Sequence, residues 1–462
     1  MKTALITATA VSVVLAGCNL APAYVQPDAA VPAAFPTGPA YSPMSDAAVQ
    51  ASWKALLTDA RLRTVIDRAL SESRSLRQSL AQVEAARALY RGQQSAVLPT
   101  VSAGLTSTFT GGDAADTESH QAYISLSSFE IDLFGRLRNE TASAFETYLA
   151  SDAGARSARV ALVAETANAW LTLAADQDLL RLAEDTAASA QQSLTVTETL
   201  FSRQLVSRLD VASARQVLEQ ANGDIADYTA QVVQDRNALA LLVGAPIEDA
   251  LLPPSLKDLD DAVGLPSPGL SSDVLLQRPD VLQAEHQLRA ANADIGAARA
   301  AMFPSLSLTA STGLVSTALS RLFSDGQDTW SASPSVSAPI FTPGARANVA
   351  YSRAQQQAAV AAYQLAVQTA FRETADALAR AGTIGAQRRA QQAQADASAD
   401  TLTLTTARYR AGIDDSLARL TAQRNDYAAQ QGVIAVLLQD LTNRIALYQA
   451  LGGSNADWTE AE

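Results

Sequence analysis

Four short runs of alternating residues limit the folds open to this chain more than any other feature. From Ser305 to Leu314, for example, the even positions hold Leu, Leu, Ala, Thr and Leu, and the odd positions hold Ser, Ser, Thr, Ser and Gly. A period of two residues indicates a β-strand whose two faces differ in polarity. We therefore predict four strands, at about 99–110, 121–131, 304–314 and 329–341.

The runs occur as two pairs about 200 residues apart, and the sequence around each pair is similar. Ser193–Leu209 matches Thr401–Leu417 in its hydroxyl-rich helical pattern and in the turn near its end. A helical segment precedes each pair of strands, and two long helical segments follow it. An internal repeat of this kind indicates a duplicated structural unit. We assign the first repeat to residues 61–243 and the second to residues 272–451.

The long segments carry the apolar spacing of coiled coils. Large apolar or aromatic residues recur every seven positions at Leu420, Tyr427, Ile434, Leu441 and Tyr448. Such a spacing predicts helices that pack along a continuous seam. Many seam positions elsewhere are alanine, which allows helices to approach closely. The predicted fold class is therefore mainly α, with four added strands.

Proline-rich segments lie on either side of the first repeat. Residues 244–271 hold five prolines and are predicted to be an irregular linker between the repeats. Residues 18–60 are predicted to form an N-terminal arm, with little helix up to about Pro43. Residues 452–462 follow the second repeat as a C-terminal tail.

The first residues have the features of a bacterial secretion signal. Lys2, an apolar stretch and the small residues before Cys18 predict a signal peptide at 1–17. Residues 15–18, LAGC, resemble the lipobox of bacterial lipoproteins. Cys18 is the single cysteine of the chain and has no partner for an intrachain disulfide. We expect Cys18 to be the lipid acceptor. The alternative is an incidental cysteine near the cleavage site. By resemblance to lipoprotein sorting, Asn19 after a lipidated Cys18 indicates the outer membrane.

The composition argues against several classes of function. The chain has 34 basic and 47 acidic residues, a formal net charge of −13, which disfavours binding to nucleic acid. Two histidines and one cysteine provide little material for a metal site or a histidine-activated nucleophile. The chain also lacks the glycine-rich motifs that hold phosphates. We therefore expect neither enzyme activity nor a metal or cofactor beyond a lipid on Cys18.

The strands suggest a membrane-spanning sheet. Runs of about ten residues match the length of tilted strands that cross a bilayer. In lipid no strand edge can remain unpaired, so the sheet has to close on itself. Four strands are too few, because about eight is the practical minimum. Copies of the chain must pool their strands: two copies give eight strands and a filled barrel, and three give twelve strands and an open one.

Several segments resemble a known family. Leu275–Gly313 and Phe129–Asn139 are similar throughout to the outer-membrane factors of bacterial efflux systems, the TolC/OprM/NodT-like lipoproteins. The resemblance implies a homotrimer with a twelve-stranded β-barrel in the outer membrane and an α-helical barrel in the periplasm. It also implies a passive conduit that exports small molecules such as drugs. The implied partners are outer-membrane lipid, a periplasmic adaptor protein and an inner-membrane pump of the RND type.

The resemblance places the functional residues at two turns between paired long helices, Phe201–Asp210 and Tyr409–Ala418. Asp210 and Tyr409 fall among positions that hold the family's periplasmic end closed. The expected gate and adaptor-contact residues are Phe201, Arg203, Gln204, Arg208, Asp210, Tyr409, Arg410, Gly412, Asp414 and Asp415. The alternative is that these turns are plain connections with solvated charges.

Two departures from the family pattern affect this site. Similar proteins usually have glycine in both turns, whereas this chain has Gln204 in the first and Gly412 in the second. We therefore expect the first turn to have a different shape. Ala418 and Thr421 stand where the family often has carboxylates, which puts a cation-selecting ring from that helix in doubt. Asp210, Asp414 and Asp415 would then provide the acidity.

Two other functions remain open from the sequence. The same conduit would serve a metal-ion efflux or type I secretion system. A structural coiled-coil lipoprotein of the envelope is a different class, and in that case the strand hairpins would lie outside the membrane.

Overall fold

The computed structural model describes residues 19–41, 52–112, 116–266, 269 and 271–454. The predicted signal peptide, Cys18 and most of the tail lie outside these residues. The chain divides into two compact units. The first comprises Met1–Asp28, Ala81–Ala153 and Leu282–Leu365, and the second comprises Ala29–Leu80, Gly154–Val281 and Ala366–Glu462.

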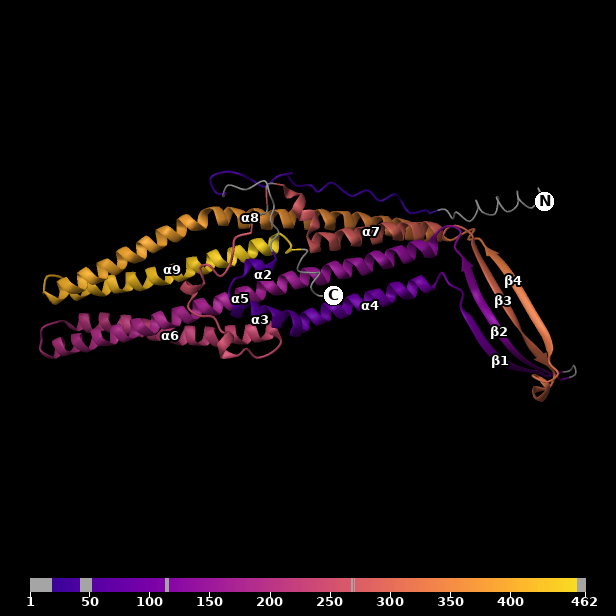
Figure 1. Cartoon of the computed structure of the whole chain (residues 1–462), viewed down its shortest axis with the longest axis horizontal. Helices are drawn as coiled ribbons and strands as arrows, with labels where there is room; N and C mark the ends of the chain where they lie inside the picture. Colours follow the sequence, from indigo (N-terminus) through magenta and orange to yellow (C-terminus); the bar gives the residue numbers. More distant parts are fainter. Residues whose placement is uncertain (1–18, 42–51, 113–115, 267–268, 270, 455–462) are drawn as a thin grey trace. The chain divides into compact units, whose positions relative to one another are not determined.

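The same order of elements occurs twice along the chain (Figure 1). Helix comes first, then an antiparallel strand pair, then two long helices. In the first half these are α3 (Ala60–Glu72), α4 (Arg74–Ser95), β1 (Val101–Thr110), β2 (Thr117–Ile131), α5 (Arg136–Ser202) and α6 (Arg208–Val243). In the second half they are α7 (Pro279–Ala300), β3 (Ser305–Ser316), β4 (Gln327–Ser337), α8 (Pro343–Arg410) and α9 (Ser416–Ala450). The described helices include none that is long and apolar enough to cross a membrane.

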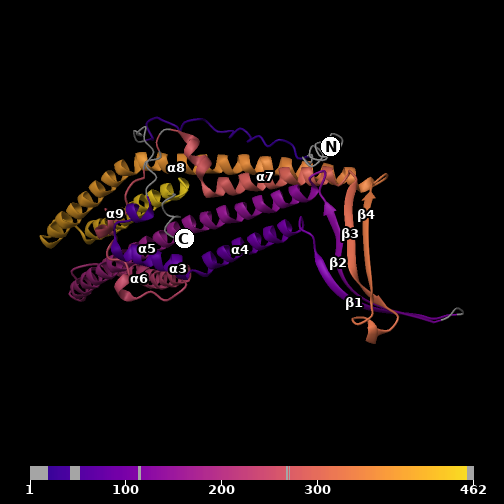
Figure 2. The same ribbon diagram turned by 45° about the vertical axis from the view of Figure 1, so that its right-hand side comes forward.

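The four strands of the first unit form one antiparallel sheet in the order β1-β2-β3-β4 (Figures 1 and 2). The ends of the strands differ from the predicted ranges by a few residues, most at the start of β2 and the end of β4. β2 begins at Thr117 rather than 121, because it pairs with β1 as far as Thr110. β4 ends at Ser337 rather than 341, because its last partner is Ser305, the first residue of β3. At the end of β4, the alternation in the sequence extends beyond the last residue that has a partner on the neighbouring strand.

The register gives the sheet one polar and one apolar face. Serines stand opposite one another across all four strands, from Ser102 to Ser125, Ser311 and Ser331. The hydroxyls of Ser102 and Ser125 lie 2.9 Å apart, as do those of Ser311 and Ser331. The other face carries large apolar side chains that are more than half exposed in the single chain: Val101, Leu105, Phe109, Ile124, Trp330 and Val336. Such an apolar surface needs a cover or an apolar solvent.

Over residues 19–41 the N-terminal arm contains no helix, as the prolines predict. Residues 19–28 run beside α7 and the first part of α8 within the first unit. The Tyr24 hydroxyl donates to Glu285 at 3.2 Å, and the Asn292 amide donates to the Pro22 carbonyl at 2.9 Å. Polar side chains of the helices thus hold this extended part of the arm in place.

The second unit contains a large apolar core that joins elements of both repeats. Trp53 of α2 (Trp53–Leu56), Ile66 of α3, Trp170 of α5 and Leu441 of α9 are at most 2 % exposed. The predicted heptad seam is buried at Leu420, Ile434, Leu441 and Tyr448, while Tyr427 is half-buried. Figures 1 and 2 both show α5 beside α6 and α8 beside α9. The prediction of long coiled-coil helices is confirmed.

The linker between the repeats is more ordered than its prolines predict. It contains two short 3-10 helices, η1 (Asp249–Leu251) and η2 (Leu256–Leu259), and Val263 forms a β-bridge with Leu57. Leu256 and Leu259 are almost fully buried in the core. The Leu251 carbonyl accepts from the Trp170 indole at 3.0 Å. Apolar residues between the prolines therefore anchor the linker.

A pair of carboxyl groups, Asp176 of α5 and Asp235 of α6, is enclosed between these helices. Burial, followed by the hydrogen bond and the charge of Asp235, raises the pKa of Asp176 to about 7. One oxygen of Asp235 is buried and has no hydrogen-bond partner among the described residues. The two acids therefore share a proton when the pH is near or below neutral.

This pair predicts a loss of stability as the pH rises. The pKa of Asp176 is 3.8 without the fold and about 7 within it, so the folded chain binds the extra proton between these values. The free energy of unfolding therefore falls from about pH 4 to 7. Asp176→Asn should raise the free energy of unfolding at pH 8 by about 1 kcal/mol, a value suited to a half-exposed pair. The unfolding temperature should therefore rise at pH 8 and change little at pH 4. Asp227→Asn, on the exposed side of α6, is the matched control. An equal shift for Asp176→Asn at both pH values would contradict the assignment.

Candidate gate at the two helix turns

The turns that join α5 to α6 and α8 to α9 have the same backbone shape. Gln204 has φ of +62° and Gly412 has φ of +72°, both in the left-handed region. Each turn is closed by an equivalent bond, from Leu205 N–H to Leu200 O at 3.0 Å and from Ile413 N–H to Arg408 O at 2.9 Å. The expectation of a different first turn is wrong. Gln204 adopts the glycine conformation, at a cost of about 1–2 kcal/mol for a residue with a Cβ.

Side-chain caps begin both helices that leave the turns. The Ser207 hydroxyl accepts from the Asp210 N–H, and the Asp210 carboxylate accepts from the Ser207 N–H at 2.8 Å, forming a capping box on α6. Asp415 caps α9 by accepting from the Ala418 N–H at 2.8 Å. The two carboxylates therefore fix the start of their helices as well as carrying charge at the turns.

Two contacts connect the first helix pair to the second at this end of the second unit. The Ser416 hydroxyl of α9 donates to the Asp210 carboxylate of α6. This bond, with that from the Ser207 hydroxyl, lowers the pKa of Asp210 below its usual range. The Arg419 guanidinium of α9 donates to the Ser193 hydroxyl of α5 at 2.8 Å. The same guanidinium lies 5.0 Å from the ring centre of Tyr409, in a cation–π contact.

The second turn contains its own ion pair. Arg408, at the end of α8, donates to both oxygens of Asp414 at 2.7 and 2.8 Å. The Arg408 guanidinium lowers the pKa of Asp414. Arg408 is exposed and Asp414 is half-buried, so this bidentate pair orders the turn rather than supplying much stability.

The predicted site residues separate into two groups. Asp210, Tyr409, Asp414 and Asp415 make the contacts described above, and Gln204 and Gly412 shape the turns. Arg203, Arg208 and Arg410 form no ion pair in the part of the chain that the structure describes, and Phe201 is 44 % exposed. Ala418 and Thr421 place no carboxylate on the first turns of α9.

The sequence interpretation missed three residues: Arg408, Ser416 and Arg419. Arg408 carries a signal that was available, because a cation in the last turn of a helix is favoured by the helix dipole. The contacts of Ser416 and Arg419 join the two repeats and have no local signal. Cys18, the predicted lipid acceptor, lies outside the described residues.

Exposed apolar side chains occupy matching positions in the two turns. Leu205 and Leu209 are 67 % and 75 % exposed, and Ile413 and Leu417 are 64 % and 58 % exposed. Each pair is separated by four residues, spanning the turn and the start of the next helix. Repetition of the pair in both halves indicates a surface for association rather than scattered exposure.

A duplicated set of long paired helices, a four-stranded sheet with an exposed apolar face, and matched helix turns are features of outer-membrane efflux channels. The family model "Outer membrane efflux protein" matches residues 65–245 and 270–453, nearly the whole described chain. The chain belongs to this family, and it is the outer-membrane component of a tripartite efflux system. The family is one of passive channels rather than an enzyme class.

Individual relatives cover nearly the full length of the chain. The chain is 41 % identical to the toluene efflux pump outer membrane protein TtgC of Pseudomonas putida, over 98 % of this chain and 96 % of that protein. It is 38 % identical to the outer membrane protein OprJ of Pseudomonas aeruginosa, with the same coverage.

Solved structures of the same kind match the fold. A membrane protein from Pseudomonas aeruginosa superposes with a TM-score of 0.88 at 38 % identity, covering 94 % of this chain and all of that chain. The open state of the MtrE outer membrane channel of Neisseria gonorrhoeae gives a TM-score of 0.85 at 35 % identity, covering 94 % and 98 %. The predictions of the family, of the fold class and of an outer-membrane location are confirmed.

Proposed function

We propose that three copies of the chain form a passive duct that carries small organic molecules out of the cell. The observation that carries this proposal is the four-stranded sheet with an exposed apolar face, whose edge strands β1 and β4 each pair with only one strand of the described chain. In lipid, β1 of one copy has to pair with β4 of the next. Three copies provide twelve strands, enough for a barrel with an open lumen lined by the serine rows.

Small organic compounds are the proposed cargo. Relatives of this chain carry names that refer to toluene and antibiotic efflux pumps. This favours small organic cargo over metal ions or proteins. Because no phosphate-binding motif is present in the sequence, the energy for export comes from an inner-membrane pump, which we propose to be of the RND type.

The exposed apolar pairs Leu205 and Leu209, and Ile413 and Leu417, support contact with a periplasmic adaptor protein at the turns. An adaptor that covers both pairs would bury apolar surface next to Asp210 and Asp414. The turns would then be the point at which adaptor binding changes the contacts between the helix pairs. We propose that the contacts from Ser416 to Asp210 and from Arg419 to Ser193, with the Tyr409 ring holding the Arg419 guanidinium, form a latch that keeps the duct closed at rest.

We also propose that Cys18 carries the lipid of a bacterial lipoprotein. The sequence LAGC and the lack of any other cysteine support this. Several acyl chains, at about 0.8 kcal/mol per buried CH₂, would hold the N-terminal arm at the membrane. Mass spectrometry of the mature N-terminus tests this proposal, and an unmodified Cys18 would overturn it.

Cell fractionation followed by conductance recording tests the duct itself. The protein is expected in the outer-membrane fraction, and the purified protein is expected to produce discrete current steps in planar bilayers. A chain recovered from the periplasm that forms no channels would instead favour a structural coiled-coil lipoprotein.

A further inference from the structure

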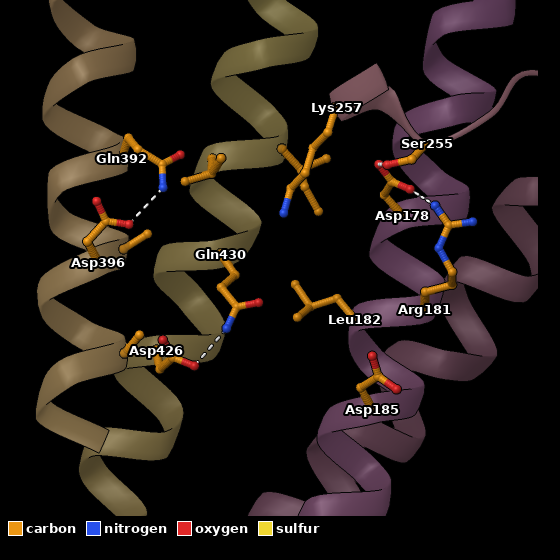
Figure 3. A pocket seen from close by; sticks show the side chains of 14 residues that line it. Asp178, Arg181, Leu182, Asp185, Ser255, Lys257, Gln392, Asp396, Asp426 and Gln430 are labelled. Carbon is orange, nitrogen blue, oxygen red and sulfur yellow. Dashed lines mark hydrogen bonds and ion pairs between the residues drawn. The ribbon is translucent and has the colours of Figure 1, made fainter. Parts of the chain in front are cut away.

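An acidic cavity lies in the second unit, away from the helix turns. It has a volume of about 370 Å³ and is lined by α5, α8, α9 and η2 of the linker (Figure 3). A volume of this size falls within the range of small-molecule sites. Four aspartates and two basic residues contribute to its lining, so the lining carries a net negative charge.

The carboxylate of Asp426 is the most unusual group in this cavity. Asp426 is only 8 % exposed, and one of its oxygens accepts from the Gln430 amide at 2.7 Å. The other oxygen is buried and has no hydrogen-bond partner in the described chain. A buried, half-satisfied carboxylate is costly unless a donor reaches it. Because Asp426 lines the cavity, a rotation of its carboxylate would bring this oxygen to a donor on a ligand.

Two further carboxylates stand at the open side of the cavity. Figure 3 shows Asp396 and Asp426 on one side and Asp185 on the other. Asp185 and Asp396 are exposed, and Asp396 accepts from the Gln392 amide at 2.8 Å. The carboxylates therefore come from α5 of the first repeat and from α8 and α9 of the second. A ligand that touches both sides would connect the two helix pairs.

The basic residues do not fully neutralise this site. Arg181 is already paired with Asp178, which also accepts from the Leu256 N–H at 2.8 Å. Lys257 points into the cavity in Figure 3, but it forms no ion pair within the part of the chain that the structure describes. Between the charged groups the wall is apolar, with Leu182, Val433 and Ile434.

We propose that this cavity binds a linear aliphatic diamine or polyamine. One ammonium group pairs with the Asp426 carboxylate, a second is attracted by Asp185 and Asp396, and the methylene chain lies against Leu182 and Ile434. A compact metal ion would contact the carboxylates but not the apolar wall, whereas an aliphatic chain with charged ends contacts both. By joining α5 to α9, the bound amine holds the two helix pairs together independently of the turns.

Isothermal titration of the purified, detergent-solubilised full-length protein with 1,5-diaminopentane and spermidine tests this inference. We expect both amines to bind, and spermidine to bind more tightly than 1,5-diaminopentane. The neutral 1,5-pentanediol should not bind. Asp426→Asn keeps the shape and the bond from Gln430, and should weaken both amines by about tenfold or more, as for loss of a charge-assisted hydrogen bond. Asp400→Asn removes the same charge from an exposed position of α8 outside the cavity. It should change the affinity less than about twofold, because salt screens the attraction between this exposed charge and the bound amine.

A second variant does not depend on a buried position. Replacing the exposed Asp185 and Asp396 with asparagine should weaken 1,5-diaminopentane but not 1-aminopentane, because the monoamine places its single charge at Asp426. Lys257→Met should strengthen binding by removing a competing cation. Equal affinities in Asp426→Asn and Asp400→Asn, no heat of binding with the wild type, or loss of binding in Lys257→Met would each overturn the proposal.

Discussion

Channels that carry Asp210→Ala together with Tyr409→Ala are expected to conduct more current than wild type in planar bilayers at low salt. The first change removes the acceptor of the Ser416 hydroxyl, and the second removes the ring beneath the Arg419 guanidinium. Each contact contributes about 0.5–1.5 kcal/mol. In the proposed trimer three copies close together, so the loss is large enough to shift the population toward the open state. The unfolding temperature of the trimer should change little, because the contacts lie at one end of the helices.

Two controls separate the latch from a general loss of order. Tyr409→Phe keeps the ring face that Arg419 contacts and should conduct like the wild type. Arg203→Ala alters an exposed residue of the same region that forms no ion pair among the described residues. The increase should also shrink at high salt, where the attraction between Arg419 and the Tyr409 ring is itself screened. A double variant that conducts like Tyr409→Phe at low salt would place the gate elsewhere.

Arg278→Met is expected to destabilise the fold strongly. Arg278 is 6 % exposed and donates to the Ala450 carbonyl at 2.6 Å, to Asp280 at 2.7 and 3.0 Å, and to Glu373 at 2.9 Å. These bonds connect the start of α7 to α8 and to the end of α9. The Asp280 and Glu373 side chains that would lose this partner are 37 % and 40 % exposed, so we expect a cost at the lower end for a buried charge, about 3 kcal/mol.

Thermal unfolding followed by circular dichroism measures this effect. In a chain of 462 residues, a loss of this size lowers the midpoint by about 3 °C. Arg389→Met, at an exposed arginine of α8, should leave the midpoint unchanged. A midpoint for Arg278→Met that equals that of Arg389→Met would show that the buried pair contributes nothing.

Patterns with a short period are enough to predict the elements of this fold. Alternation in Ser305–Leu314 identifies β3, and the seven-residue spacing from Leu420 identifies the buried seam of α9. The ends of the strands cannot be predicted in this way, because the strand that pairs with each end decides where it stops. Residues 338–341 continue the alternation without a partner from β3.

The sites are harder to predict, because they depend on contacts between distant segments. A proline such as Pro279 is typical of a helix start, and α7 does begin there, but the same motif gives no sign that Arg278 reaches the end of α9. Asp210 is expected at the gate from resemblance alone. Its partner Ser416 lies in the other repeat, and only the packing of α6 against α9 brings the two together. The prediction for the first turn is wrong because Gln204 tolerates a conformation usual for glycine.

Disulfide cross-linking between the two edges of the sheet tests the central claim most directly. Thr106→Cys in β1 is combined in turn with a cysteine at Ser331, Ser333 or Ser335 in β4, and Cys18 is the only other cysteine. If copies close into a barrel, at least one pair will bring its Cβ atoms to the separation of about 3.5–4.5 Å that a disulfide needs. Mild oxidation in membranes should then give covalent species that end at the trimer, while variants with only one introduced cysteine beside Cys18 give none. No cross-link at any pair, or a ladder that continues beyond the trimer, would contradict a closed barrel of three chains.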